Sequence, residues 1–273
     1  MPDRYAFAGI GIAVILGCLV AMSSEASAQT TGQPHHGLLL QVVYNNVPYR
    51  EDLTTGWGFA CLIEGLDDTV LFDTGSDGEI LLSNMERVGV DAGDVDVVVL
   101  SHIHGDHTGG LDAFLARRGG VTVFVPASFP AAFGQRVVEH GARMVSVSGP
   151  RLLVERVHST GEMGHATREQ ALIVETARGL VVMTGCAHPD VADMAERAKD
   201  YLDQDIHLLM GGFHLGGRSD AEIRAIIARL KALGVEWVAP SHCTGERVMS
   251  LFREAWGEHY IEGGLGARIE VPE

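Results

Sequence analysis

Three histidines and an aspartate fall within six residues, in the segment from His102 to His107 that reads HIHGDH. Imidazole nitrogens and carboxylate oxygens are ligands that Zn²⁺, Mn²⁺ and Fe²⁺ accept in proteins. The H-x-H-x-D-H spacing presents His102 and His104 to one side of the chain, and Asp106 and His107 to another. The segment therefore predicts one loop that contributes ligands to two metal ions.

Apolar strands must position these side chains. Residues 97–101 read as a buried strand that leads into the histidine-rich loop, and α/β folds place their sites at the carboxyl ends of such strands. Two later apolar runs end in the same way, since residues 180–184 precede His188 and residues 235–239 precede His242. We therefore expect His188 and His242 to lie at the same rim as the loop.

Apolar runs alternate with helical patterns from residue 38 onward. The best-defined helix covers residues 219–233, where Ser219 and Glu222 have the spacing of a capping box and Gly234 ends the pattern. Hairpin-like strand pairs followed by strand–helix alternation predict an α/β fold, an αββα sandwich of two mixed β-sheets flanked by helices. The predicted strands lie near residues 38–43, 59–64, 69–73, 97–101, 121–125, 143–147, 152–157, 171–176, 180–184, 206–210 and 236–239, and the predicted helices near 79–88, 109–116, 128–139, 190–201, 219–233 and 246–256.

The amino terminus has the pattern of a secretory signal peptide. Arg4 precedes an apolar run over residues 6–22, and Ala-Ser-Ala at residues 26–28 forms a cleavage site. An uncleaved membrane anchor and a lipoprotein attached through Cys18 are the alternatives, which the cleavage site and the residues before Cys18 disfavour. We predict a periplasmic or secreted protein with no membrane attachment after cleavage. The predicted parts are a signal peptide at 1–28, a polar leader at 29–37 and a catalytic domain at 38–273.

Composition narrows the class of partner. The chain of 273 residues has 20 Lys and Arg against 36 Asp and Glu, which gives a formal charge of −16. Such an excess of negative charge excludes sequence-independent binding to nucleic acid, so we expect a small-molecule substrate. Cleavage would leave Cys61, Cys186 and Cys243. An odd number of thiols indicates at least one free or metal-associated cysteine rather than a disulfide scaffold.

The HIHGDH loop resembles the metal-binding motif of the metallo-β-lactamase superfamily, whose fold is the αββα sandwich. Several other segments resemble one branch of it, which includes the dihydropterin–ribofuranosylaminobenzene phosphate synthase-like proteins and many metal-dependent hydrolases. The resemblance covers residues 38–250. The segments that carry it are residues 56–64 (GWGFACLIE), 69–75 (TVLFDTG), 184–189 (TGCAHP), 211–215 (GGFHL) and 240–245 (PSHCTG).

The resemblance implies one or two zinc ions per chain, with Mn²⁺ or Fe²⁺ as alternatives. His102, His104 and His188 are assigned to the first ion. Asp106, His107 and His242 are assigned to the second.

Four residues have further implied roles. Asp73 accepts a hydrogen bond from the metal loop and orients a ligand. Asp106 also orients the attacking water and receives its proton. His214 contacts substrate, donates a proton or serves as another ligand. Cys186 stands where the superfamily often has an aspartate that bridges the two metal ions. It is either a thiolate ligand or a buried residue that lines the site. Without the bridging carboxylate, we expect the second ion to be lost more readily.

These features predict a metal-activated water that hydrolyses an ester, thioester, lactone, amide or phosphoester. Four alternatives remain. They are a transferase acting on a pterin and a ribosyl phosphate, a true β-lactamase, a redox enzyme and a metal-binding protein without activity. Residues 126–170 contain few motifs, and we expect them to form the rim that faces the substrate. The histidines without ligand-like spacing are expected at the surface or packed as polar residues; they are His140, His158, His165, His207 and His259.

Overall fold

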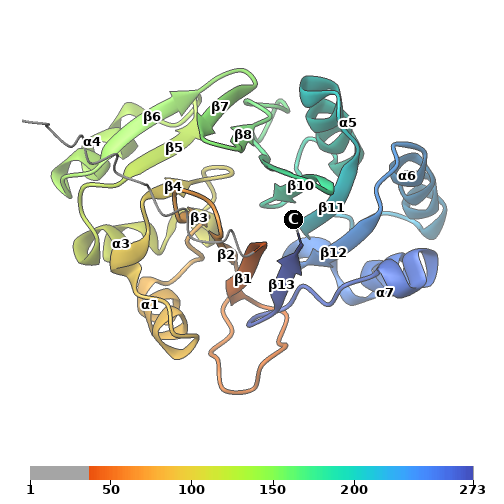
Figure 1. Ribbon diagram of the computed structural model, residues 1–273, viewed down its shortest axis with the longest axis horizontal. Helices are drawn as coiled ribbons and strands as arrows, with labels where there is room; N and C mark the ends of the chain where they lie inside the picture. The colour runs from red at the N-terminus through yellow and green to blue at the C-terminus, as the bar shows by residue number, and fades with distance from the viewer. Residues whose placement is uncertain (1–36, 273) are drawn as a thin grey trace, which may run out of the picture. The chain divides into compact units, whose positions relative to one another are not determined.

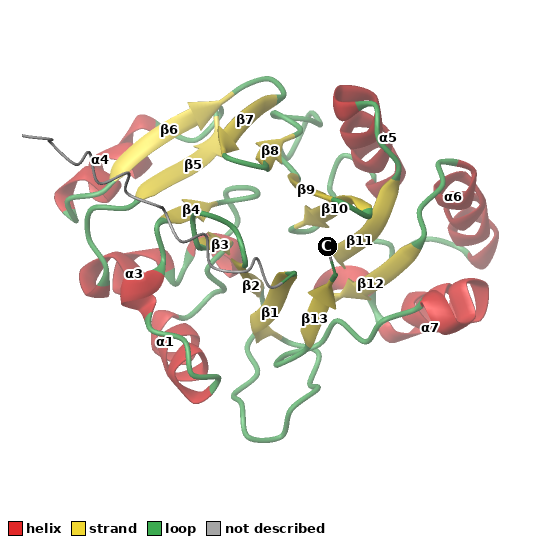
Figure 2. Cartoon of the chain, viewed as in Figure 1, coloured by secondary structure: helices red, strands yellow, loops and turns green. Residues whose placement is uncertain are grey.

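Two β-sheets lie face to face between two layers of helices in the computed structural model, which describes residues 37–272 (Figures 1 and 2). The predicted signal peptide and all but the last residue of the predicted leader lie outside the described residues. The αββα sandwich predicted from the sequence is therefore the observed architecture. No helix within residues 37–272 combines the length and the apolar character needed to cross a bilayer.

The first sheet has seven strands and is mixed. The pairs β13–β1, β1–β2 and β2–β3 are antiparallel, whereas β3, β4, β5 and β6 run parallel to one another. Because parallel strands end at the same edge, the residues after β3 and β4 come together. In spatial order the strands are β13 (Arg268–Val271), β1 (Leu38–Asn45), β2 (Phe59–Glu64), β3 (Val70–Phe72), β4 (Val97–Val99), β5 (Thr122–Pro126) and β6 (Arg143–Val147).

The second sheet has six strands and is also mixed. β10, β11 and β12 run parallel, and β7, β8 and β9 add to them as antiparallel neighbours. The parallel strands again deliver their following loops to one edge. In spatial order the strands are β12 (Trp237–Ser241), β11 (Ile206–Gly212), β10 (Gly179–Thr184), β9 (Leu172–Thr176), β8 (Val157–Ser159) and β7 (Arg151–Val154).

Helices cover the outer face of each sheet (Figure 1). Apolar side chains of α1, α3 and α4 pack on the first sheet, and those of α5, α6 and α7 pack on the second. Ser219 and Glu222 form the predicted capping box at the start of α6. The helices are α1 (Gly78–Arg87), α2 (Gly105–Thr108), α3 (Leu111–Arg117), α4 (Ala131–Glu139), α5 (Val191–Leu202), α6 (Asp220–Ala232) and α7 (Glu246–Trp256), with short 3₁₀ helices η1 (Ala92–Asp94), η2 (His242–Thr244) and η3 (Gly257–His259).

The strand sequences explain why both faces of each sheet are covered. Along β10, Val181 and Met183 point into the core between the sheets, while Leu180 and Val182 point toward the helices. A strand buried on both sides reads as a continuous apolar run rather than as an alternation. That burial holds the strand ends, and the loops after them, in fixed positions.

Three elements differ from the sequence-based prediction. The single strand predicted at 152–157 is a hairpin of β7 and β8, whose turn includes Arg156 at a φ of 63°. No glycine, asparagine or proline marks that turn, so the apolar run reads as one strand. Strand β13 pairs with β1 and was not predicted. Helix α2 was also missed, because its four residues are too few for a helical pattern.

Candidate metal centre

The histidine-rich loop begins after β4 and runs into α2, so His102 and His107 lie on either side of a tight turn. Both side chains are fully buried, whereas His104 between them is exposed. Thr74 secures the turn, since its backbone N–H and its hydroxyl both donate to the carbonyl oxygen of His107, each at 2.9 Å. At Gly58, with a φ of 143°, a Cβ would lie 2.2 Å from the Asp106 carbonyl oxygen, so that position requires glycine.

Asp73 lies beneath this loop and is fully buried. Its Oδ2 accepts hydrogen bonds from Nδ1 of His107 and from Oγ of Ser101, each at 2.7 Å. Because the Ser101 hydroxyl gives its one proton to Asp73, it must accept from Nδ1 of His102, 2.9 Å away. Asp73 therefore leaves Nε2 of both His102 and His107 without a proton. That is the state in which an imidazole binds a metal.

Asn46 likewise fixes the tautomer of His242 that has no proton on Nε2. Its Oδ1 accepts from Nδ1 of His242 at 2.6 Å, and its amide donates to the carbonyl oxygen of His242 at 3.3 Å. The unprotonated Nε2 of His242 then faces Asp106, whose Oδ2 lies 3.4 Å away. His242 has a φ of 51°, a left-handed conformation that costs free energy in a non-glycine residue and that these contacts help to hold.

A buried glutamate organises the loop after β10. Oε1 of Glu169 accepts the backbone N–H groups of Gly185, Cys186 and Ala187 at 2.9 to 3.1 Å, and Oε2 accepts that of His188 at 2.9 Å. Glu169 is fully buried, and this burial raises its pKa to about 7 against the opposing effects of the His188, Ala187 and Cys186 N–H groups and of His107. The carboxylate thus fixes the loop that carries Cys186 and His188.

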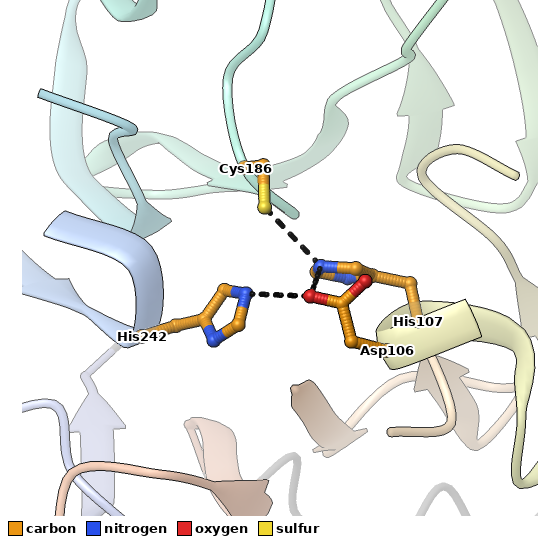
Figure 3. A group of neighbouring side chains, drawn as sticks. All are labelled: Asp106, His107, Cys186 and His242. Atoms are coloured by element: carbon orange, nitrogen blue, oxygen red, sulfur yellow. Dashed lines mark hydrogen bonds and ion pairs between the residues drawn. The ribbon is translucent and has the colours of Figure 1, made fainter. Parts of the chain in front are cut away.

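These loops bring the potential ligands into one cluster. Figure 3 shows Cys186 and His242 directed toward Asp106 and His107. Cys186 Sγ lies 3.3 Å from Nε2 of His107, and Asp106 Oδ2 lies 3.6 Å from the same nitrogen. Four groups have donor atoms within 4.8 Å of one another: Asp106, His107, Cys186 and His242; His102, Cys186 and His188; His102, His104 and Asp106; and Cys186, His214 and Cys243.

The electrostatics of the cluster favour the neutral forms of His102 and His188 but the charged form of His107. Burial lowers the pKa of His102, and the neighbouring histidines lower it further. The pKa of His188 is lowered to about 4, mainly by burial and further by His214 and His104. Burial opposes the charged form of His107, but the charge and hydrogen bond of Asp73 outweigh it and raise its pKa.

The charged form of Asp106 is also favoured against burial. Burial acts to raise its pKa, but the neighbouring His242 and His107 outweigh burial and hold the pKa well below the usual range. Its side chain is 20% exposed, so the carboxylate is reachable from solvent.

Two ring nitrogens indicate that the site fits metal. Nε2 of His188 and Nε2 of His242 are buried and make no hydrogen bond, although a buried polar atom without a partner costs free energy. Both histidines belong to groups of neighbouring donors, which together include imidazole, carboxylate and thiol, a mixture that suits Zn²⁺. The donor set and the unpartnered nitrogens therefore fit a metal ion.

The structure brings all six predicted metal ligands into this cluster. Asp106, His107 and His242 share one donor group. His102 shares one group with His188 and another with His104 and Asp106, so the ligands assigned to the first ion do not form a single group. Asp73 hydrogen-bonds His107 of the loop, and Cys186 Sγ lies 3.3 Å from Nε2 of the same residue. His214 lies at the outer edge, its ring 4.5 Å from that of His188.

Four of the remaining histidines make contacts away from this cluster. His140 lies near Asp112, His158 and His207 pair with Glu175 and Glu236, and His259 stacks on Trp237. His158 is buried, and His259 is exposed, so both expected environments occur.

Sequence reasoning missed several residues that support the site. Glu169 falls in the stretch 126–170 that was expected to face the substrate, yet it is buried beneath the loop after β10. Asn46 and Ser101 were missed because their roles depend on contacts made by folding. Trp57 lies within a segment that the sequence singled out, and its ring is 5.2 Å from that of His242.

Comparison with known proteins agrees with this geometry. The model of the metallo-β-lactamase superfamily matches residues 55–207, more than half of the chain. The chain belongs to this superfamily. The match includes the HIHGDH loop and His188, and membership supports an enzyme with a metal-dependent, hydrolase-type function.

Three relatives of this superfamily member illustrate the match. The 7,8-dihydropterin-6-methyl-4-(beta-D-ribofuranosyl)-aminobenzene-5'-phosphate synthase of Methanocaldococcus jannaschii is 25% identical, over 78% of this chain and 89% of that protein. The metal-dependent hydrolase Tm1679 of the beta-lactamase superfamily is 26% identical, with a TM-score of 0.73 over 86% of this chain and all of that one. YhfI from Bacillus subtilis, at 16% identity and a TM-score of 0.65 over the same shares, has the same fold.

Proposed function

We propose that this protein is an exported zinc-dependent hydrolase acting on a small ester, thioester, lactone, amide or phosphoester. The observation that carries the proposal is the convergence of six metal-binding side chains, whose buried Nε2 atoms on His188 and His242 have no hydrogen-bond partner. The chemistry supplied by a bound divalent ion is Lewis acidity and a water whose pKa is lowered toward ~7.

The side chains around the site have distinct roles in this proposal. Asp106 is ionised and partly exposed, so it orients the attacking water by accepting a hydrogen bond. His214 is exposed at the edge of the cluster and contacts a substrate oxygen. Asp73 and Asn46 keep the ligand imidazoles in the tautomers that bind metal.

A synthase is the second candidate. The relative from Methanocaldococcus jannaschii is a 7,8-dihydropterin-6-methyl-4-(beta-D-ribofuranosyl)-aminobenzene-5'-phosphate synthase and aligns over most of both chains. The predicted export signal argues against this activity, because precursors of an intracellular pathway are not normally available outside the membrane. Turnover of a dihydropterin with an aromatic ribosyl phosphate by the purified protein would favour the synthase.

Export is itself part of the proposal. The mature chain is expected to begin near Gln29, after the Ala-Ser-Ala site at residues 26–28. Mass spectrometry of the protein recovered from the periplasm or the medium tests this directly. A recovered chain that retained residues 1–28 would contradict it.

The function is tested with purified, zinc-loaded protein on a panel of lactones, thioesters, phosphodiesters and β-lactams. We expect turnover of at least one class, its loss on chelation and its return with zinc. His104→Ala should abolish that turnover, whereas His259→Ala, which changes a ring stacked on Trp237, should leave it unchanged. Absence of metal-dependent turnover across the panel would favour a metal-binding protein without activity.

A further inference from the structure

We propose that Cys186, His214 and Cys243 form a separate binding site for a thiophilic metal ion, beside the histidine-rich centre. Their donor atoms, two thiol sulfurs and one imidazole nitrogen, all lie within 4.8 Å of one another. Two sulfur donors distinguish this set from the nitrogen and oxygen donors of the HIHGDH loop. Soft ions such as Cu⁺ and Cd²⁺, and borderline Zn²⁺, prefer such ligands.

The three donors come from the ends of three parallel strands. Cys186 follows β10, His214 follows β11, and Cys243 lies in η2 after β12. The strand ends are joined by hydrogen bonds: the Gly212 N–H donates to the Gly185 carbonyl oxygen at 3.1 Å, and the Phe213 N–H to Thr244 Oγ1 at 3.0 Å. The site is therefore held by hydrogen bonds that need no ion.

Close packing places the Cys243 sulfur against β11. A Cβ at Gly212 would lie 2.7 Å from Cys243 Sγ and 2.4 Å from the Gly185 carbonyl oxygen. Cys243 Sγ also donates a hydrogen bond to the Cys186 carbonyl oxygen at 3.7 Å. Glycine at position 212 thus lets the sulfur approach the loop that carries Cys186.

Accessibility suits a binding site. His214 is exposed and Cys243 is partly exposed, whereas Cys186 is buried at the base. All three cysteines within residues 37–272 are free thiols, so both sulfurs are available. His214 has a left-handed φ of 47°, an unfavourable conformation that holds its ring beside the two sulfurs.

Sharing of Cys186 couples this site to the histidine-rich centre. Cys186 belongs to three of the four donor groups, whereas His214 and Cys243 belong only to this one. Cys243 has no role in the proposed function, so its substitution separates the new site from the centre on which that function depends. The Cys186 sulfur that would bind an ion here also lies 3.3 Å from His107 Nε2.

The test titrates Cd²⁺ into metal-free, fully reduced protein and follows the near-ultraviolet thiolate-to-cadmium absorption, with bound Cd²⁺ per chain from equilibrium dialysis. Cys243→Ser should lower the absorption by about half, because it removes one of two sulfur donors. His214→Gln should weaken the same Cd²⁺ equivalent, and this exposed position is not expected to affect folding. His104→Ala should retain the full absorption.

Cys61→Ala is the matched control, since Cys61 is a buried thiol of β2 outside all four donor groups. It should leave the absorption unchanged, and circular dichroism should show that every variant is folded. An unchanged absorption in Cys243→Ser would overturn the proposal and leave Cys186 as the sole sulfur ligand. Substrate turnover is measured separately, so its failure, with the cadmium result intact, would count against the proposed hydrolase alone.

Discussion

Oδ2 of Asp73 lies 2.7 Å from Nδ1 of His107 and accepts a hydrogen bond from it. The same oxygen accepts the hydroxyl of Ser101, which in turn faces Nδ1 of His102. One buried carboxylate oxygen therefore sets the tautomer of a histidine in each half of the cluster. Orientation of ligands by such outer contacts contributes substantially to metal affinity.

Asp73→Asn should lower zinc affinity by about 10- to 100-fold, because an amide nitrogen in place of Oδ2 cannot accept both hydrogen bonds. Competition with a chromophoric chelator measures the affinity. Asp67→Asn, at an exposed turn before β3, is the matched control and should have no effect. Equal affinities for Asp73→Asn and the wild type would show that Asp73 does not orient the ligands.

Glu169→Ala should destabilise the metal-free protein by several kcal/mol, because it leaves four buried N–H groups without their acceptor. Glu169→Gln should be milder, since an amide oxygen at the Oε1 position still accepts three of them. Urea denaturation compares the free energies of unfolding. Glu162→Gln, which alters a carboxylate bonded to the single N–H of Ser128, is the control and should cost less. Identical free energies for Glu169→Ala and wild type would remove Glu169 from its supporting role.

Site residues that directly follow an apolar strand can be predicted from the sequence, whereas residues that reach the site from elsewhere in the fold cannot. His102, His107, His188 and His242 were predicted because each follows an apolar strand, and parallel strands end at one edge. Glu169 has no such signal, because it approaches the loop after β10 from a segment without a motif. Strand β13 was missed although Ile269 and Val271 alternate with exposed residues, because four residues give too short a pattern.

Trp57→Ala should raise KM for the best substrate by about 2- to 10-fold with a smaller change in kcat, if the indole contacts substrate. The side chain is 59% exposed although its ring lies 5.2 Å from that of His242. An exposed aromatic ring at the edge of a site offers apolar contact area. Tyr49→Ala is the control, because Tyr49 is 58% exposed in the same β1–β2 connection and packs near Gly264. Equal KM values for Trp57→Ala and wild type would exclude that contact.

Acidification should release the ion held by Asp106, His107 and His242 before the ion held by His102, His104 and His188. A protonated imidazole has no lone pair for a metal, so affinity falls as the pH drops through the pKa of the free ligand. The pKa of His107 is raised above 6.5, whereas that of His102 is lowered and that of His188 is about 4.

Protons therefore compete for His107 at a pH where His102 and His188 are still neutral. Zinc content measured by dialysis between about pH 8 and pH 5 should fall from two ions to one before the last is lost. His107→Ala, which lacks the group with the raised pKa, should retain a single ion with the midpoint of the more acid-resistant step. Simultaneous loss of both ions from the wild type would contradict this order. Loss of the histidine-only ion first would show that Asp73 does not control the protonation of His107 in the zinc-bound protein.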